Sequence, residues 1–411
     1  MKLDRGELVL LTTAALGVGI SSWVVWVSFT PEWKVMGVDF SVFYAAAHLA
    51  SLGVDPYRSS ANSVQDFANP PAIAFLLGPI SGLPFRAAFA LFSAVSTAIA
   101  GASIILYANR LGWRRSWLVA AAALSSWVGF QGLWWGQFDA LLVAALLVAV
   151  LAARRGWYLA VGLVMGTAWV KPDLLWPAVL FFGIGLWPNR QATLRFAAGV
   201  VLTSIALLAL DARFLSEWLR TLIGFGGGLT RQPDLAGFAA WVDALPASWH
   251  LGSGFSSPAV WAIMLLALAA LGWLGRQVLT APRWRSLSQE RMVVWSVSLA
   301  LGIWLLVTPY SHPSDELLLL PLLMLVVGTD ASQAGQAWPA AALLTMATLP
   351  LTWNFPVLPV ALTPVATAVL LIAGVRAFRR ESAEPATLPP DLVLGSARLP
   401  SLVQHSPQPW P

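Results

Sequence analysis

The chain has 411 residues, of which 58% are hydrophobic and only 10% charged, and a mean hydropathy of +0.72, so water is excluded as its main solvent. It contains no cysteine, which excludes disulfides, thiolate catalysis and cysteine-based metal sites. Its net charge of +5 does not indicate a nucleic-acid partner, because the arginines lie in short loops between apolar runs.

Apolar runs long enough, or nearly long enough, to cross a membrane occupy most of the sequence. A crossing helix needs roughly 20 apolar residues, so we predict an all-α integral membrane protein, a polytopic bundle of about 12 transmembrane helices. The first run follows Lys2 and Arg5 without a small-residue cleavage site, so we expect it to be retained as a span. The predicted spans are residues 8–28, 86–109, 117–132, 138–153, 157–170, 174–187, 195–210, 257–275, 292–309, 317–328, 337–352 and 357–375.

The loops between these spans alternate in charge, and basic residues collect in the cytoplasmic loops of membrane proteins. The basic loops contain Lys2, Arg5, Arg110, Arg114, Arg115, Arg154, Arg155, Arg190, Arg195, Arg276, Arg283, Arg285, Arg291, Arg376, Arg379 and Arg380. The other loops contain more acidic than basic residues. We therefore expect a multi-pass protein of the cell membrane, with both termini in the cytoplasm and the acidic loops on the outer face.

Two outward loops are long enough to hold structure of their own, residues 29–85 and 211–256. In the first, residues 41–52 have helical spacing and residues 72–83 are apolar but too short to cross, which predicts interfacial helices. Residues 1–380 are expected to form the transmembrane domain. The proline-rich segment 381–411 is expected to be a disordered cytoplasmic tail.

The first motif with possible chemistry runs from Gly37 to Tyr44 and contains Asp39. A carboxylate just beyond the first span lies between water and lipid, where partial desolvation raises its basicity toward that of a general base. Alternatively, Asp39 is the N-cap or a first-turn acid of the following helix, and one residue can serve both purposes. Tyr44, in the same motif, is a candidate substrate contact.

Two further outward motifs carry candidate substrate contacts. One is Asn69, which precedes two prolines, and the other includes Trp134, Trp135, Gln137 and Asp139 at the end of a short span. Paired indole rings next to an amide and a carboxylate offer a stacking platform with hydrogen-bonding groups, which suits a sugar. The alternative is an aromatic belt at the membrane surface, which places tryptophan at the same depth.

Ionisable residues near the membrane form the last two motifs. Lys171 lies between two apolar runs, where it could bind a phosphate; a simple ion pair with Asp173 is the alternative. His312, which follows Tyr310, could orient a phosphate or share a proton with a carboxylate, or it could be a solvated loop histidine.

The order of these motifs resembles glycosyltransferase family 87, whose best-known members are polyprenyl-phosphate-mannose-dependent mannosyltransferases. The resemblance extends over residues 35–325. It rests on Asp39-Phe40, Phe43-Tyr44, Ala46-Ala47, residues 53–57, Pro70-Pro71, Gly136-Gln137, Lys171-Pro172, His312 and residues 317–321. Asn69 departs from the tyrosine more common before the proline pair, and Asp139 from the expected asparagine, so the sugar or acceptor can differ from those of the known members.

The resemblance implies a C-type glycosyltransferase fold with an outward-facing site. It implies that Asp39 is the catalytic base, with His312 near the site. It further implies a lipid-linked sugar phosphate as donor, a glycolipid or glycan as acceptor, inversion at the anomeric carbon, and no metal or other cofactor. The departing phosphate gains charge and needs a cation, for which Lys171, His312 and Arg231 are the candidates.

Two other classes of function remain open. A transporter or flippase also fits about 12 spans with both ends inside, although carriers place ionisable residues near the membrane midplane. A non-catalytic assembly partner is the third possibility.

Overall fold

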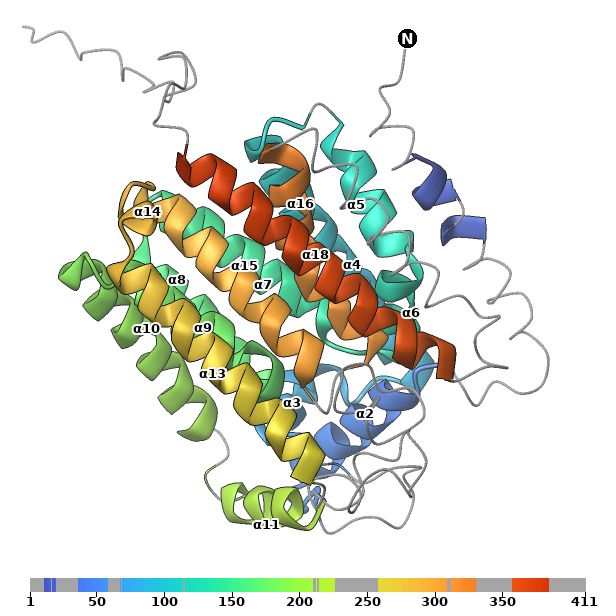
Figure 1. Ribbon diagram of the computed structural model, residues 1–411. Coiled ribbons are helices and arrows are strands. Elements are labelled where there is room, and N and C mark those ends of the chain that lie inside the picture. The colour runs from blue at the N-terminus through green and yellow to red at the C-terminus, as the bar shows by residue number, and fades with distance from the viewer. Residues whose placement is uncertain are drawn as a thin grey trace, which may run out of the picture.

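The computed structural model describes residues 11–15, 17–19, 36–57, 67, 69–113, 115–209, 212, 214–225, 258–308, 312–329 and 357–383. In these residues every regular element is a helix (Figure 1). The all-α prediction is therefore confirmed for the described part of the chain. The elements are α2 (Val38–Ser51), α3 (Ala72–Leu77), η3 (Gly78–Ile80), α4 (Phe85–Arg110), α5 (Ser116–Ser125), α6 (Trp127–Trp135), α7 (Asp139–Arg154), α8 (Tyr158–Met165), η4 (Gly166–Val170), α9 (Pro172–Leu186), α10 (Arg190–Ala209), α11 (Leu215–Phe225), α13 (Pro258–Thr280), α14 (Pro282–Arg285), α15 (Gln289–Val307), η8 (Pro313–Leu319), α16 (Leu320–Thr329) and α18 (Val357–Ala383).

Four of these helices, α4, α10, α13 and α15, are long and apolar enough to cross a membrane. A fifth span is possible where α6 and α7 meet at a bend of 120°. The described residues thus support a multi-pass membrane protein but show four or five of the predicted spans rather than about 12. Several predicted spans are shorter helices, and span 337–352 and most of span 8–28 lie outside the described residues.

The predicted span 117–132 is wrong, because the helix is interrupted at Ser126, between α5 and α6. Ser126 is the N-cap of α6, and its hydroxyl accepts a hydrogen bond from the backbone N–H of Gly129. Gly129 lies so close to α5 that a Cβ there would be 2.3 Å from the carbonyl oxygen of Ala123. The small residue therefore allows the two short helices to fold against each other.

The helices differ greatly in burial, which separates the core from the surface that faces lipid. In α15, 78% of the apolar window is buried, compared with 17% in α10. The exposed side of α10 carries large apolar side chains, among them Val201, Leu202 and Ile205, which water would not favour. On its other side Gly199 lies against α8, where a Cβ would be 2.4 Å from the carbonyl oxygen of Leu159. Such close backbone contact at small residues is typical of helix pairs in membranes.

The polar contacts gather at two opposite ends of the bundle. At the first end, which we call the arginine end, Arg154 forms an ion pair of 2.5 Å with Glu290, and Arg291 pairs with Glu381. Trp295 Nε1 also donates to Glu381 Oε2 at 3.1 Å. These contacts hold the last turn of α18, which continues to Ala383. The predicted tail therefore begins later than residue 381, and the rest of it lies outside the described residues.

The opposite end, which we call the Asp39 end, carries the short helices α2, α3 and α11, at the bottom of Figure 1. The predicted helix 41–52 is confirmed as α2, which is followed by Gly53 with a φ of 76°. The predicted helix 72–83 is divided into α3 and η3, because Pro79 lacks the N–H that would continue the α-helical ladder.

Candidate active site

Asp39 lies where the beginning of α2 meets the end of α6. The backbone N–H of Gly37 donates to the carbonyl oxygen of Trp134 at 2.8 Å. Gly37 has a φ of 71° and Gly136 a φ of 78°, a region that L side chains rarely adopt. A Cβ on Gly136 would also lie 2.4 Å from the Cβ of Phe40. Glycine at this position therefore allows the two helix ends to approach.

This approach joins the Asp39 carboxylate to Gln137. Gln137 Nε2 donates a hydrogen bond to Asp39 Oδ2 at 2.6 Å, across 98 residues of sequence. The N-cap of α2 is Gly37, so the alternative that Asp39 is the cap is wrong. The alternative that it is a first-turn acid is confirmed, and a carboxylate is favourable there. Asp39 is half-buried, whereas Gln137 is buried, so the carboxylate keeps access to a ligand.

Three charged side chains form a buried cluster at the same end of the bundle, which we call the Lys171 cluster. Lys171 Nζ lies 2.9 Å from Asp139 Oδ1 and 2.8 Å from Asp315 Oδ1. The exposed fractions of these side chains are 9% for the lysine and 1% for each aspartate. Burial alone lowers the pKa of the Lys171 ammonium, but the attraction of the two carboxylates outweighs burial and raises that pKa. The ammonium therefore stays charged.

The cluster joins three segments that are distant in sequence. Asp139 is the first residue of α7, Lys171 lies between η4 and α9, and Asp315 belongs to η8. Lys171 pairs with these two aspartates rather than with Asp173, so the alternative of a local Lys171–Asp173 ion pair is wrong. Asp173 is exposed, and its carbonyl oxygen accepts from Trp304 Nε1 at 2.6 Å.

His312 is buried rather than solvated, with an exposed fraction of 7%. Its backbone N–H donates to Asp315 Oδ2 at 2.7 Å, so one carboxylate holds both His312 and Lys171. The imidazole ring stands edge-on to Trp135, with ring centres 5.8 Å apart. The alternative of a solvated loop histidine is therefore wrong.

The remaining predicted substrate contacts lie against different parts of the structure. The Tyr44 hydroxyl donates to the carbonyl oxygen of Leu83 at 2.6 Å, which ties α2 to the turn before α4. The carbonyl oxygen of Asn69 accepts from the Tyr57 hydroxyl at 2.7 Å. Trp134 is buried against Met36, Phe130 and Trp135. These contacts do not join Tyr44 or Asn69 to Asp39. Arg231 and Tyr310 lie outside the described residues.

Asp315 is the functional candidate that the sequence analysis missed. A signal for it exists, because an acid three residues after His312 at the start of a helical segment is typical of a capping box. That pattern predicts the hydrogen bond to the His312 N–H. It does not predict the ion pair with Lys171, which depends on the fold.

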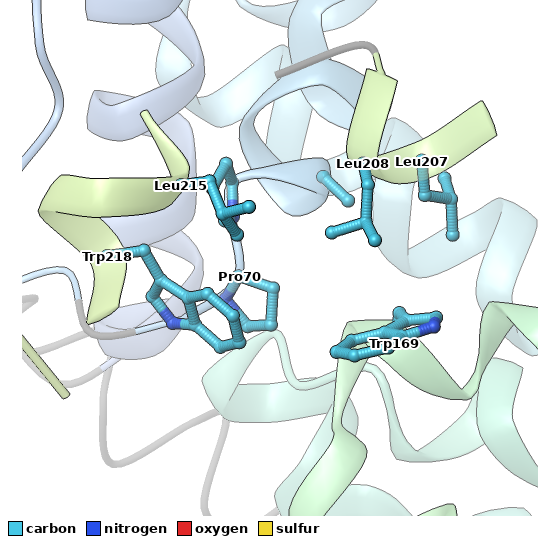
Figure 2. A pocket seen from close by; sticks show the side chains of 8 residues that line it. Pro70, Trp169, Leu207, Leu208, Leu215 and Trp218 are labelled. Carbon is cyan, nitrogen blue, oxygen red and sulfur yellow. The ribbon is translucent and has the colours of Figure 1, made fainter. Parts of the chain in front are cut away.

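An apolar cleft lies between α3, η4, α10 and α11 (Figure 2). Figure 2 shows Trp218, Pro70 and Trp169 along one side of it, facing Leu215 and Leu208. Trp169 precedes Lys171 by two residues, and its Nε1 donates to Ser204 of α10 at 2.7 Å. Trp169 thus connects the wall of the cleft to the segment that carries Lys171. The lining residues of the cleft are Pro70, Pro71, Ala72, Trp169, Leu207, Leu208, Leu215 and Trp218.

The described residues thus combine a half-buried carboxylate, a buried charged cluster and an apolar cleft in a helical membrane protein. Comparison with known families gives the class: a family model for glycosyltransferase family 87 matches residues 67–309. The chain belongs to glycosyltransferase family 87, a family of membrane glycosyltransferases with the C-type fold. The matched residues include Gln137, Asp139 and Lys171, whereas Asp39 lies 28 residues before the match and His312 three residues after it. A search among curated proteins found no significant match.

Proposed function

We propose that this glycosyltransferase moves a hexose from a polyprenyl-phosphate sugar to a lipid or glycan acceptor. Mannose is the hexose that we propose first. The observation that carries the proposal is the Asp39 carboxylate, which Gln137 holds at 2.6 Å while leaving it half-buried at one end of the bundle. A general base needs this combination of orientation and access.

The proposed reaction needs one base. Asp39 takes the proton from an acceptor hydroxyl while that oxygen forms a bond to the anomeric carbon. The bond from this carbon to the donor phosphate breaks on the opposite face, so the configuration inverts. Polyprenyl phosphate leaves with the electron pair as a stable anion, and no general acid is required. A hydrogen-bond donor or cation near the leaving oxygen stabilises the charge that develops there.

Among the candidate phosphate contacts, the ion pairs already made by Lys171 favour His312. The Lys171 ammonium already has two carboxylate partners, so its charge is compensated within the cluster and attracts a phosphate less than an unpaired cation would. The His312 ring lies beside Trp135, a candidate platform for the sugar. Arg231 remains a third candidate for the phosphate, and Tyr44, Asn69, Trp134, Asp139 and Tyr310 remain candidates for contacts with the substrates.

The apolar cleft supports a lipid-linked donor. Its lining is almost entirely hydrocarbon and indole, which can contact part of an isoprenoid chain but offers little to a soluble nucleotide sugar. The lipid-facing side of α10 adjoins it, so a chain could enter from the bilayer.

We propose that the Asp39 end faces outward and the arginine end faces the cytoplasm, because basic residues collect on the cytoplasmic side. The ion pairs of Arg154 and Arg291 at the arginine end support this orientation. The proposal includes cytoplasmic termini and about 12 spans in the 411 residues.

The test is the purified protein in liposomes with a radiolabelled polyprenyl-phosphate mannose and a phosphatidylinositol mannoside as acceptor. We expect a mannosylated acceptor of inverted configuration together with free polyprenyl phosphate in equal amount. Movement of the label across the bilayer without release of polyprenyl phosphate would contradict the enzyme and support a flippase.

A further inference from the structure

The Lys171 cluster connects the two parts of the proposed site. Asp139 follows Gln137 by two residues, and Gln137 holds the base Asp39. Asp315 accepts from the backbone N–H of His312, the proposed phosphate contact, through Oδ2 and binds Lys171 through Oδ1. The only charged side chain that bonds to both aspartates, among the described residues, is Lys171.

The helix α6 brings the same two segments together from another direction. A Cβ on Gly132 would lie 3.0 Å from Asp139 Oδ2 and 3.4 Å from the Cβ of Ser314. The absence of a side chain at Gly132 thus allows the first turn of α7 and the first turn of η8 to lie against one helix. The ammonium then fixes their separation by direct bonds to both carboxylates.

Burying this cluster costs free energy, and a gain in the stability of the fold does not explain why the charges are there. Three charges removed from water lose their hydration, and replacing a buried ion pair with apolar residues often leaves a protein as stable as before. A buried ionic contact fixes geometry more strictly than apolar packing does, because it depends on direction and distance. The cluster lies between the proposed base and the proposed phosphate contact, where a fixed geometry keeps the two reacting parts of the site in register.

We propose that Lys171 is a positioning residue that acts through Asp139 and Asp315 to fix His312 relative to Asp39, and does not itself contact the donor phosphate. This inference rests on the proposed function. A phosphate contact and a positioning residue differ in kinetics, because loss of a ground-state contact raises KM whereas misplacement of reacting groups lowers kcat.

The first variant is Lys171→Met, measured in liposomes with labelled polyprenyl-phosphate mannose. We expect kcat to fall about tenfold to a hundredfold, while KM for the donor changes less than about twofold. The matched control is Arg154→Met, which breaks the ion pair with Glu290 at the arginine end and is expected to leave both constants unchanged. A large rise in donor KM at unchanged kcat would make Lys171 a phosphate contact and overturn the proposal.

The second variant, Asp315→Asn, serves if Lys171→Met does not fold, because it keeps the pair of Lys171 with Asp139. It removes one competing carboxylate, so a lysine that bound phosphate would bind the donor more tightly and lower its KM. The positioning role predicts instead a lower kcat with an unchanged KM, and a larger loss of kcat in Asp315→Ala, which has no acceptor for the His312 N–H.

The activity of the wild-type protein distinguishes failure of the proposed function from failure of the positioning role. If it releases no polyprenyl phosphate, the proposed function fails. If it turns over normally and both Lys171→Met and Asp315→Asn match it in kcat, the positioning role fails while the proposed function stands.

Discussion

The Asp39 carboxylate combines two properties that oppose each other at most buried sites. The hydrogen bond from Gln137 Nε2, at 2.6 Å, fixes the direction of the carboxylate. The half-buried position leaves a route for an acceptor hydroxyl. A base that is held but accessible can remove a proton without first reorganising.

Replacing Gln137 tests the value of this orientation. Gln137→Leu removes the donor at similar volume, and we expect kcat to fall about tenfold to a hundredfold, because a hydrogen bond to a charged group contributes about 1.5–3 kcal/mol. Steady-state kinetics in liposomes measure the effect. Gln289→Leu, at the arginine end, removes an amide that accepts from the Tyr158 hydroxyl and should leave kcat unchanged. Equal kcat values for both variants would show that Asp39 acts without Gln137.

The candidate residues were accessible from the sequence to different degrees. The sequence alone indicates Asp39, Gln137, Lys171 and His312, because each is a polar residue at the end of an apolar run. Their contacts could not be predicted, since 98 residues separate Gln137 from Asp39 and 144 separate Lys171 from Asp315. The ion pair with Asp315 replaces the nearer Asp173 because the fold brings η8 against the first turn of α7.

At the scale of elements, the approach of α2 to α6 depends on glycine. Gly136 and Gly53 both have a positive φ, but a Cβ meets Phe40 at 2.4 Å in the first case and open space in the second. The two positions therefore separate backbone strain from steric conflict.

We expect Gly136→Ala to lower both the unfolding midpoint and the transfer rate, since it adds a clash to a backbone penalty of about 1–2 kcal/mol. Gly53→Ala carries only the backbone penalty and should retain the transfer rate. Thermal unfolding in detergent and the liposome assay measure the two effects. A Gly136→Ala protein as active as Gly53→Ala would mean that the close approach of α2 and α6 is dispensable.

Four elements line the apolar cleft. If the cleft binds the isoprenoid chain, KM for the donor should depend on the length of that chain. Trp218→Ala removes part of the cleft wall, so we expect KM for a long-chain polyprenyl donor to rise about tenfold, a loss of about 1.5 kcal/mol of apolar contact. The rise should be much smaller for a donor with a short chain. Trp273→Ala, on the exposed side of α13, is the control. A chain-independent rise in KM would rule out the cleft as the site of the isoprenoid.

Hydrophobic pattern located most helices but not their breaks. The predicted spans 86–109 and 138–153 match α4 and α7 closely, because uninterrupted apolar runs end at arginines. The break between α5 and α6 was missed, since Ser126 and Gly129 interrupt the helix through a cap and a close contact rather than through polarity. The end of α18 was also missed, because Glu381 is held by Arg291 from another helix.

At the scale of the whole molecule, charge is divided between two ends. The helix α7 begins with Asp139 in the Lys171 cluster and ends with Arg154 in the ion pair with Glu290. Its 16 residues correspond to a length of about 24 Å, most of the roughly 30 Å thickness of the hydrocarbon core. The two polar ends are therefore separated by a distance that fits opposite membrane surfaces.

The absence of cysteine makes the orientation directly measurable. Ser51 at the end of α2 and Ser286 after α14 are both exposed, at the Asp39 end and the arginine end respectively. In intact cells we expect Ser51→Cys to react with a membrane-impermeant thiol reagent, and Ser286→Cys to react only after permeabilisation. The reverse pattern would place the proposed site in the cytoplasm.

The most direct measurement is the rate at which Asp39→Asn transfers sugar from a labelled polyprenyl-phosphate donor, compared with Asp55→Asn. Asp55 lies on the same loop, where its carboxylate accepts from the backbone N–H of Tyr57 at 2.9 Å. We expect a loss of about a hundred- to ten-thousand-fold for Asp39→Asn, with unchanged insertion and folding, and a wild-type rate for Asp55→Asn. A wild-type rate for Asp39→Asn would show that Asp39 is not the catalytic base.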